Sequence, residues 1–323
     1  MDFVRLGRTD VEVPTIGLGT WPLSGPNVAR GVEVGWSGHD DALAKRALVH
    51  AYEVGLTHWD TADAYGDGQA ERLIGGVLKD LPRAEMFIAT KIGWDPGAYS
   101  HYYHPDQIRK QLLRSLANLG VDVIDLYYLH HCDFGPESEY LDDAIETVRR
   151  IRDEGKIKFI GLSDWKSELV LKYAPLVDPD VVQIYRNVRN DGYGSSGLRE
   201  WVEAHDVGAV FFSPLDHGLL LGKYSEPVTF ASGDFRNRVE GFRDPDLLAV
   251  LKSNREKLIE RFRDHPQPIL HGLVGSLLAD STNSCVLVGM RNPNQVDVAA
   301  AATQALTGED AEWVRSLYSS LGS

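Results

Sequence analysis

The 323-residue sequence has few cysteines and no long apolar run, and each shortage excludes a class of protein. Its two cysteines, Cys132 and Cys285, are too few for a disulfide framework, and no Cys-x-x-Cys spacing is present for a zinc or redox site. No apolar stretch approaches the length needed to cross a bilayer, and the first residues lack the basic-then-apolar pattern of a signal peptide. We therefore expect a cytoplasmic protein without a membrane partner.

Positive charge is also in short supply. Lysine and arginine together number 33 against 47 aspartates and glutamates, which gives a formal net charge of −14. A protein that binds nucleic acid by neutralising phosphates needs the opposite balance, so we expect no nucleic-acid partner. The remaining composition, 43% hydrophobic and 25% charged, is that of a globular protein with a large core. A small molecule is the expected partner, and the oligomeric state is left open.

Three familiar site patterns are missing or incomplete. The pair Gly17-x-Gly19 is followed by Pro22 where a dinucleotide fingerprint needs its third glycine. No Gly-x-Ser-x-Gly elbow of a serine hydrolase occurs. The pair His101-x-x-His104 has no third ligand in a supporting motif, so no metal is expected.

Eight short apolar runs recur along the chain, and the segments between them carry helical spacing. Strands that alternate with helices and are buried on both faces favour a closed parallel barrel over an open sheet. The sequence therefore predicts an α/β fold, a TIM (β/α)8 barrel. The predicted strands are Thr15–Leu18, Leu56–Trp59, Met86–Thr90, Ile124–Leu129, Lys158–Leu162, Val181–Ile184, Ala209–Phe212 and Cys285–Val288.

Three segments lie outside this repeat. Residues 3–6 and 11–13 flank turn residues and predict an N-terminal β-hairpin that closes the barrel's bottom. Residues 222–263 are longer than a barrel connection needs, which indicates a surface excursion ending in a helix at 245–263. A start signal at Thr307 predicts a last helix over 310–321. We expect extra C-terminal helices and one domain over 1–323.

Ionisable side chains follow three consecutive predicted strands. Asp60 and Tyr65 come after the second strand, Lys91 ends the third and His130 ends the fourth. Because the carboxyl ends of barrel strands face a common mouth, we expect these four side chains to meet. Each of them alone would more often be a surface group, but their joint placement favours catalysis.

The chemistry of this set is that of proton donation to a carbonyl oxygen. Lowering a phenol's pKa from about 10 to about 7 costs about 4 kcal/mol. An ammonium about 4 Å away contributes about as much at an effective dielectric near 20, although a neighbouring carboxylate would cancel part of it. We therefore expect Lys91 to lower the pKa of Tyr65, Asp60 to position Lys91, and His130 to hydrogen-bond the reacting oxygen.

These motifs resemble the aldo-keto reductase superfamily. The resemblance implies a TIM barrel that binds an extended nicotinamide cofactor, usually NADPH with NADH as an alternative, and reversibly reduces an aldehyde or ketone to an alcohol. The substrate is left open between sugars or other polyhydroxylated carbonyls, small aldehydes and polycyclic ketones. The matching segments are Gly17-Leu18-Gly19-Thr20-Trp21, Asp60-Thr61-Ala62, Tyr65-Gly66-Asp67-Gly68 with Glu71, Lys91, His130, Gly161-Leu162-Ser163, Gln183, Phe212-Ser213-Pro214-Leu215, Gly218-Leu219-Leu220, Gly222-Lys223 and Gly289-Met290-Arg291.

The same resemblance implies a set of cofactor contacts. Ser163, Asp164 and Gln183 would hold the nicotinamide carboxamide, and Phe212 would stack on its ring. The remaining implied contacts are Ser213, Leu215, Gly218 and Leu219 at the pyrophosphate, Gly289, Arg291 and Gln295 at the adenosine, and Thr20, Trp21 and Lys223 elsewhere along the cleft.

The sequence departs from the family pattern at several of these positions. Asp164 stands where the family usually has asparagine, and Arg186 stands where it usually has tyrosine, which we expect to reshape the substrate side. The preference for the phosphorylated cofactor rests on Arg291, with Lys223, Arg236 and Arg238 as helpers.

Two further questions stay open. Some members of the superfamily are cofactor-binding regulatory subunits of membrane channels, so a redox-sensing barrel with little turnover is the alternative to an enzyme. An aromatic substrate wall is as well supported as ordinary core packing for Trp21, Trp36, Trp94, Tyr99, Tyr102 and Tyr103. Asp63 and His131 neighbour the four candidate residues and are expected to cap or pair locally, with contact to the site as the alternative for either.

Overall fold

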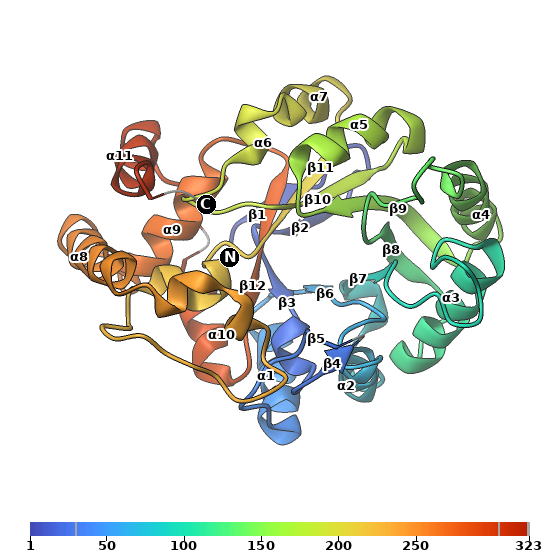
Figure 1. The fold of residues 1–323 in the computed structure, drawn as a ribbon, viewed down its shortest axis with the longest axis horizontal. Coiled ribbons are helices and arrows are strands. Elements are labelled where there is room, and N and C mark those ends of the chain that lie inside the picture. The colour runs from blue at the N-terminus through green and yellow to red at the C-terminus, as the bar shows by residue number, and fades with distance from the viewer. Residues whose placement is uncertain (30, 303, 322–323) are drawn as a thin grey trace.

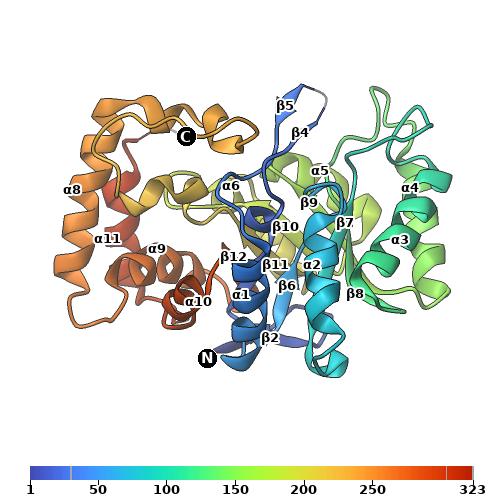
Figure 2. The same ribbon diagram turned by 90° about the horizontal axis from the view of Figure 1, so that it is seen from below.

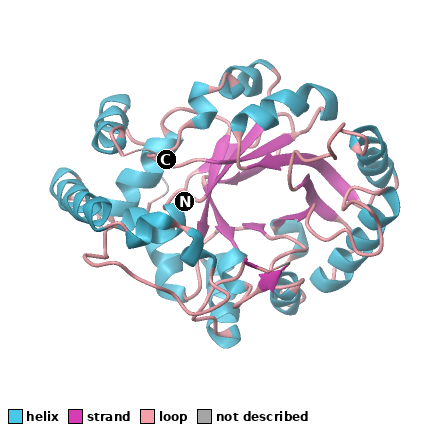
Figure 3. Ribbon diagram, viewed as in Figure 1, coloured by secondary structure: helices cyan, strands magenta, loops and turns pink. Residues whose placement is uncertain are grey.

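The computed structural model describes residues 1–29, 31–302 and 304–321. Eight parallel strands close into a barrel in the order β3-β6-β7-β8-β9-β10-β11-β12, and helices surround it (Figures 1 and 3). The predicted TIM barrel is confirmed. Its strands are β3 (Ile16–Gly19), β6 (His58–Asp60), β7 (Phe87–Ile92), β8 (Ile124–Leu129), β9 (Ile157–Asp164), β10 (Val181–Tyr185), β11 (Gly208–Phe212) and β12 (Ser284–Gly289).

Every predicted strand corresponds to one of these, and two of them run two residues further than predicted at the carboxyl end. Strand β7 continues to Ile92 through Lys91, and β9 continues to Asp164 through Ser163. The prediction ended where the apolar run ends, whereas pairing with neighbouring strands continues through the polar residues. The strand ends therefore carry the polar side chains on rigid backbone.

Helices pack their apolar faces on the outside of the barrel. In the first of them, Asp40 caps the N-terminus by accepting a hydrogen bond from the Leu43 amide, and Ala44, Ala47 and Leu48 are buried. Among the described residues, no helix combines the length and apolar character that crossing a lipid bilayer requires. The helices are α1 (Asp41–Glu53), α2 (Gln69–Leu78), α3 (Pro105–Leu119), α4 (Leu141–Asp153), α5 (Ser167–Val177), α6 (Gly192–Ser195), α7 (Leu198–Ala204), α8 (Pro245–Arg261), α9 (Pro268–Leu278), α10 (Pro293–Ala300) and α11 (Gly308–Tyr318).

The N-terminal hairpin closes one end of the barrel, as predicted. Strands β1 (Phe3–Arg5) and β2 (Glu12–Pro14) pair antiparallel. Leu6 and Val13 are fully buried and join a cluster that includes Val210 from inside the barrel. In Figure 2 the N-terminus and β2 lie at the end opposite the carboxyl ends of the strands.

The predicted excursion and tail are also present. Helix α8 begins at Pro245 after Asp244, whose carboxylate accepts hydrogen bonds from two backbone amides. Helix α11 begins two residues earlier than predicted, because Thr307 caps it by accepting from the Asp310 amide.

A second hairpin at the carboxyl end of the barrel was not predicted. Strands β4 (Val28–Ala29) and β5 (Val32–Glu33) have two residues each, too few to produce a hydrophobic pattern. This hairpin is tied to the excursion, because Gly233 O accepts from the amides of Asn27 and Gly35. Figure 2 shows β4 and β5 projecting from this end of the molecule.

Candidate active site

Lys91 lies at the centre of the polar groups that the strand ends bring together. Its Nζ donates to Asp60 Oδ1 at 2.5 Å and to the Thr61 carbonyl oxygen at 2.7 Å, and lies 3.5 Å from the Tyr65 hydroxyl. Lys91 is fully buried and Asp60 is 2% exposed. The structure thus places Asp60, Tyr65 and Lys91 within contact of one another.

Gln183 holds the other side of Asp60. Its Nε2 donates to Asp60 Oδ2 at 2.8 Å, so each carboxylate oxygen of Asp60 has a donor. Two donors from opposite directions fix the carboxylate, and the carboxylate in turn fixes the Lys91 ammonium. Gln183 was expected from the resemblance to contact the cofactor, and this contact with Asp60 is an addition that the sequence did not indicate.

The electrostatics of the phenol differ from the expectation. Burial raises the pKa of Tyr65 well above 10, and the carboxylates of Asp60 and Asp63 raise it further. The expected lowering by Lys91 is wrong for this structure, because burial raises the pKa of the phenol and Asp60 pairs with the ammonium. Burial also lowers the pKa of Lys91, which Asp60 opposes. Tyr65 is therefore a protonated phenol, a group that can give a proton.

His130 is a neutral imidazole beside this phenol. Its ring lies edge-on to that of Tyr65, with 6.1 Å between the ring centroids. Burial lowers the pKa of His130 well below 6.5, and the charges of His131 and Lys91 lower it further. A neutral imidazole has one N–H to donate, which suits it to hold a carbonyl oxygen.

The two neighbours expected to cap or pair locally behave differently. His131 stacks on His130 at 4.6 Å between centroids with the rings 2° from parallel, and it lines the same cavity. Its ring therefore touches the site. Asp63 is 3% exposed, and it lines neither of the two cavities at Tyr65. Burial raises the pKa of Asp63, and the charge of Glu71 raises it further.

Two cavities adjoin at Tyr65. The first, of about 330 Å³, contains His130 and a largely aromatic lining. The second, of about 170 Å³, extends from Asp60 to Arg291. Residues lining both are Trp21, Tyr65, Gln183 and Phe212. The rest of the first cavity is lined by Val34, Ala64, Trp94, His130, His131, Ser163, Asp164, Trp165, Phe235 and Arg238.

The proposed aromatic wall is therefore half right. Trp21 and Trp94 line the first cavity and Trp36 lines the second. The tyrosines at 99, 102 and 103 line neither, and Tyr103 is fully buried with its hydroxyl donating to the His131 carbonyl. The sequence interpretation missed Trp165, which directly follows Ser163 and Asp164 at a strand end; that position was a usable signal.

The residues implied as cofactor contacts line these cavities, with one exception. Leu219 is fully buried in a hydrophobic cluster with Leu220 and Phe242, so its side chain faces away from both. Those lining the second cavity are Thr20, Trp21, Gln183, Phe212, Ser213, Leu215, Gly218, Lys223, Gly289, Arg291 and Gln295, while Ser163 and Asp164 line the first.

Asp164 is held by the backbone around it. Its Oδ2 accepts from the Cys132 amide at 2.8 Å and its Oδ1 accepts from the Lys166 amide at 2.9 Å. Each carboxylate oxygen therefore has a backbone partner. The aspartate that replaces the family's usual asparagine fixes the loop after β8 against β9.

Of the four cations expected at the cofactor phosphate, three line the second cavity. Lys223 and Arg291 line the second cavity, and Arg291 Nη1 donates to the Ser37 carbonyl at 2.8 Å. Arg236 lines it too, but its guanidinium makes two hydrogen bonds to Asp234. Arg238 lines the first cavity instead, so the expectation that it lies beside the cofactor phosphate is wrong.

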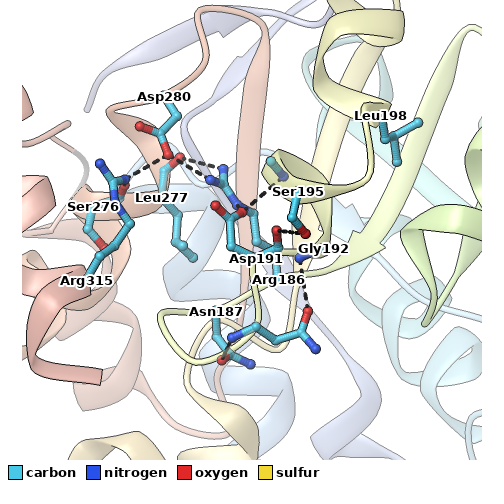
Figure 4. A network of polar contacts seen from close by, with 12 residues as sticks. Arg186, Asn187, Asp191, Gly192, Ser195, Leu198, Ser276, Leu277, Asp280 and Arg315 are labelled. Atoms are coloured by element: carbon cyan, nitrogen blue, oxygen red, sulfur yellow. Dashed lines mark hydrogen bonds and ion pairs between the residues drawn. The ribbon is translucent and has the colours of Figure 1, made fainter. Parts of the chain in front are cut away.

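Arg186 also lies away from the expected substrate side. It is 1% exposed and pairs with Asp191 at 2.6 Å and with Asp280 at 2.7 Å (Figure 4). Asp280 in turn pairs with Arg315 at 2.8 Å. Figure 4 shows that this network joins the end of β10 to α9 and α11. The Arg186 guanidinium is thus paired within the fold, and Arg186 lines neither cavity.

The chain matches the Aldo/keto reductase family over residues 15–319. It is 27% identical to the aldo-keto reductase YhdN of Bacillus subtilis, over 96% of this chain and 91% of that protein. It is 26% identical to the NADH-specific methylglyoxal reductase of Escherichia coli, over 99% of each.

Solved structures agree in fold. The glycerol dehydrogenase AKR11B4 of Gluconobacter oxydans superposes with a TM-score of 0.80 at 24% identity, over 98% of this chain and 94% of that one. An aldo-keto reductase of Klebsiella pneumoniae in complex with NADPH gives 0.70 at 22% identity, over 98% and 95%.

Proposed function

The chain belongs to the aldo/keto reductase family, and we propose that Tyr65 is the proton donor of its carbonyl reduction. The protein is an NAD(P)H-dependent oxidoreductase that reduces an aldehyde or ketone to an alcohol. The observation that carries the assignment of Tyr65 is its position where the two cavities meet, 3.5 Å from Lys91.

Each polar group then has one task. Tyr65 gives its proton to the carbonyl oxygen, and its raised pKa keeps that proton in place until the oxygen becomes basic. Lys91 places positive charge beside the phenolic oxygen as the proton leaves, and Asp60 holds Lys91 there. His130 donates a hydrogen bond to the same carbonyl oxygen and orients it.

The second cavity fits an extended nicotinamide cofactor, which when bound supplies the hydride. Gly218 has φ +92° and a Cβ built there meets nothing within 4 Å, so backbone is open to a ligand at that point. Lys223 has no carboxylate partner among the described residues, so its charge is available to bind a phosphate. Gln183 and Ser163 would hold the nicotinamide end, Phe212 its ring, Ser213 and Leu215 the pyrophosphate, and Gly289, Arg291 and Gln295 the adenosine.

We propose NADPH as the preferred form. Arg291 and Lys223 both line the second cavity, and two cations suit a 2′-phosphate. The relative from Klebsiella pneumoniae binds NADPH, whereas the Escherichia coli relative is NADH-specific. NADH is the alternative, and a titration that compares the two cofactors tests it.

Three finer points belong to the same proposal. The enzyme is of the carbonyl reductase type, able to run as an alcohol dehydrogenase when the cofactor ratio favours oxidation. Residues 1–323 act as one barrel domain, which the family match over 15–319 supports. Its place of action is the cytoplasm, which two unpaired cysteines support.

The test is a panel of carbonyls and alcohols followed by cofactor absorbance, with the Tyr65→Phe variant alongside. We expect Tyr65→Phe to lower kcat by about 10²- to 10⁴-fold while cofactor affinity stays within about twofold. A fully active variant would assign the proton to another group. A wild type that binds the cofactor and scarcely turns over any carbonyl would instead indicate the redox-sensing barrel.

A further inference from the structure

We propose that Arg238 binds a carboxylate of the substrate, and that the substrate is a flat, largely apolar carbonyl compound carrying that acid. This inference rests on the proposed function, because it assigns a ligand to the cavity that holds Tyr65 and His130. The sequence had assigned Arg238 to the cofactor phosphate, whereas the structure places it in the lining of the first cavity.

The first evidence is the lining of the first cavity. It includes the five rings of Trp21, Trp94, Trp165, Phe212 and Phe235. Aromatic faces pack well on flat rings. A polyhydroxylated sugar would need a hydrogen-bond partner for each hydroxyl that it buries, and these five side chains offer only indole N–H groups, of which that of Trp21 already donates to the Val34 carbonyl.

The second evidence is the charge of that lining. The histidines at 130 and 131 both have pKa values lowered by burial, so near neutral pH neither carries a charge. Asp164, the one carboxylate among the lining residues, already accepts two backbone hydrogen bonds. Arg238 is therefore the one positive group among the described residues that line this cavity.

The third evidence is the contrast between Arg238 and Arg236 on the same short turn. Arg236 makes two hydrogen bonds to Asp234 and is 9% exposed. Arg238 is exposed, and no carboxylate of the described residues pairs with it. Its guanidinium lies 5.5 Å from the centroid of Phe235, a wall residue. One arginine of the turn is used by the fold and the other faces the cavity.

The turn itself is held in place. Asp234 accepts from the backbone amides of Ser37 and Arg236, and Asn237 bonds to the backbone of Phe230. A guanidinium on a fixed turn loses less freedom when it binds an acid. It matches a carboxylate with two parallel hydrogen bonds, whereas a phosphate dianion is better matched by two cations, and the part of the lining that the structure describes offers one.

The test compares two aldehydes of the same shape, 4-carboxybenzaldehyde and methyl 4-formylbenzoate. We expect wild type to reduce the acid with a kcat/KM at least about 10-fold above that of the ester. Arg238→Gln should bring the ratio to about one by raising KM for the acid, and should leave the ester within about twofold. Arg243→Gln, a nearby exposed arginine outside the first cavity, should leave the ratio unchanged.

A binding measurement separates this inference from the proposed function. Benzoate and benzamide have the same ring, and their binding can be followed through quenching of the tryptophans that line the cavity. We expect benzoate to bind wild type more tightly, and Arg238→Gln to remove the difference. Benzoate selectivity that depends on Arg238, without reduction of either aldehyde, would overturn the proposed function and leave the acid site standing. An acid-to-ester ratio near one in wild type, or one that Arg238→Gln does not change, would overturn the acid site.

Discussion

The ammonium of Lys91 lies 3.5 Å from the phenolic oxygen of Tyr65, farther than from either of its other two oxygen partners. Most of its charge is therefore compensated by Asp60, and the phenol keeps a raised pKa. Lys91 acts at the moment when the proton leaves Tyr65 and negative charge develops. The resting site holds a neutral acid beside an ion pair.

Replacing Lys91 by methionine should remove activity and also stability. Asp60 would remain as a buried carboxylate with only Gln183 as donor, and breaking a buried pair costs about 3–5 kcal/mol. The double variant Asp60→Asn with Lys91→Met removes both charges, so we expect it to regain most of that stability. Its kcat should stay at least about 100-fold below wild type. Urea unfolding and turnover measure the two effects, and a double variant that recovered turnover would exclude Lys91 from the chemistry.

The stacked pair of His130 and His131 predicts the acid limb of the pH profile. His130 must be neutral to act as described, and its pKa is lowered first by burial and then by the charges of His131 and Lys91. His131 faces Asp164 and Asp133, which favour its protonation, so it takes the first proton as pH falls. Activity should therefore persist below pH 6.5 and be lost only as pH falls through the depressed pKa of His130.

His131→Phe keeps a stacked ring and removes the like charge. The pKa of His130 should rise, and the acid limb of kcat/KM should move to higher pH by about one unit. Burial and Lys91 remain, so the limb should stay below 6.5. A profile of kcat/KM between pH 4.5 and 9 measures the shift, with the plateau near neutral pH as the internal control. An unmoved limb would mean that the two imidazoles do not titrate together.

The strands and the four central residues were predictable because their signals are local. A barrel strand buried on both faces reads as a short apolar run, and all eight runs were visible. Asp60 and Tyr65 stand five residues apart, Lys91 is the last but one residue of β7, and His130 directly follows β8. The fold then brings these strand ends to one mouth whatever the rest of the sequence does.

What could not be predicted depends on partners far away in the sequence. Arg186 has its second carboxylate at Asp280, in the connection between α9 and β12, and nothing near Arg186 indicates that pairing. Arg236 and Arg238 look alike in the sequence, and only the pairing of Arg236 with Asp234 separates their roles. The pKa of Tyr65 likewise depends on how tightly Asp60 pairs with Lys91.

Arg291 predicts the choice between the two nicotinamide cofactors. Its guanidinium is oriented by a hydrogen bond to the Ser37 carbonyl, and Arg291 lines the second cavity. Fluorescence titration should show tighter binding of NADPH than of NADH. Arg291→Ala should weaken NADPH by about 10- to 100-fold, the value of a charge-assisted hydrogen bond, and NADH by less than about twofold. Equal affinities in wild type would refute the preference.

Replacing Arg186 should lower the stability of the fold and leave the chemistry of the active site intact. The guanidinium is 1% exposed, bridges Asp191 and Asp280, and lies 4.7 Å from the ring centroid of Phe211. Arg186→Met would leave both carboxylates without this partner, but Asp191 is 42% exposed and Asp280 keeps Arg315, so we expect the free energy of unfolding to fall by about 2–3 kcal/mol. Arg315→Gln is the matched control, because Arg315 is 29% exposed on the same Asp280, so its loss should cost about 1 kcal/mol.

Turnover measurements distinguish a structural role of Arg186 from a role in substrate binding. Neither Arg186 nor Asp280 lines the cavities that meet at Tyr65. The folded fraction of Arg186→Met should therefore keep its kcat/KM within about twofold, measured well below its unfolding temperature. If that variant kept wild-type stability but lost turnover or changed its carbonyl preference, Arg186 would act on the substrate side, as the sequence had indicated. The two carboxylates that neutralise Arg186 argue for the structural role, because a buried guanidinium with both partners in place has no charge left to offer a ligand.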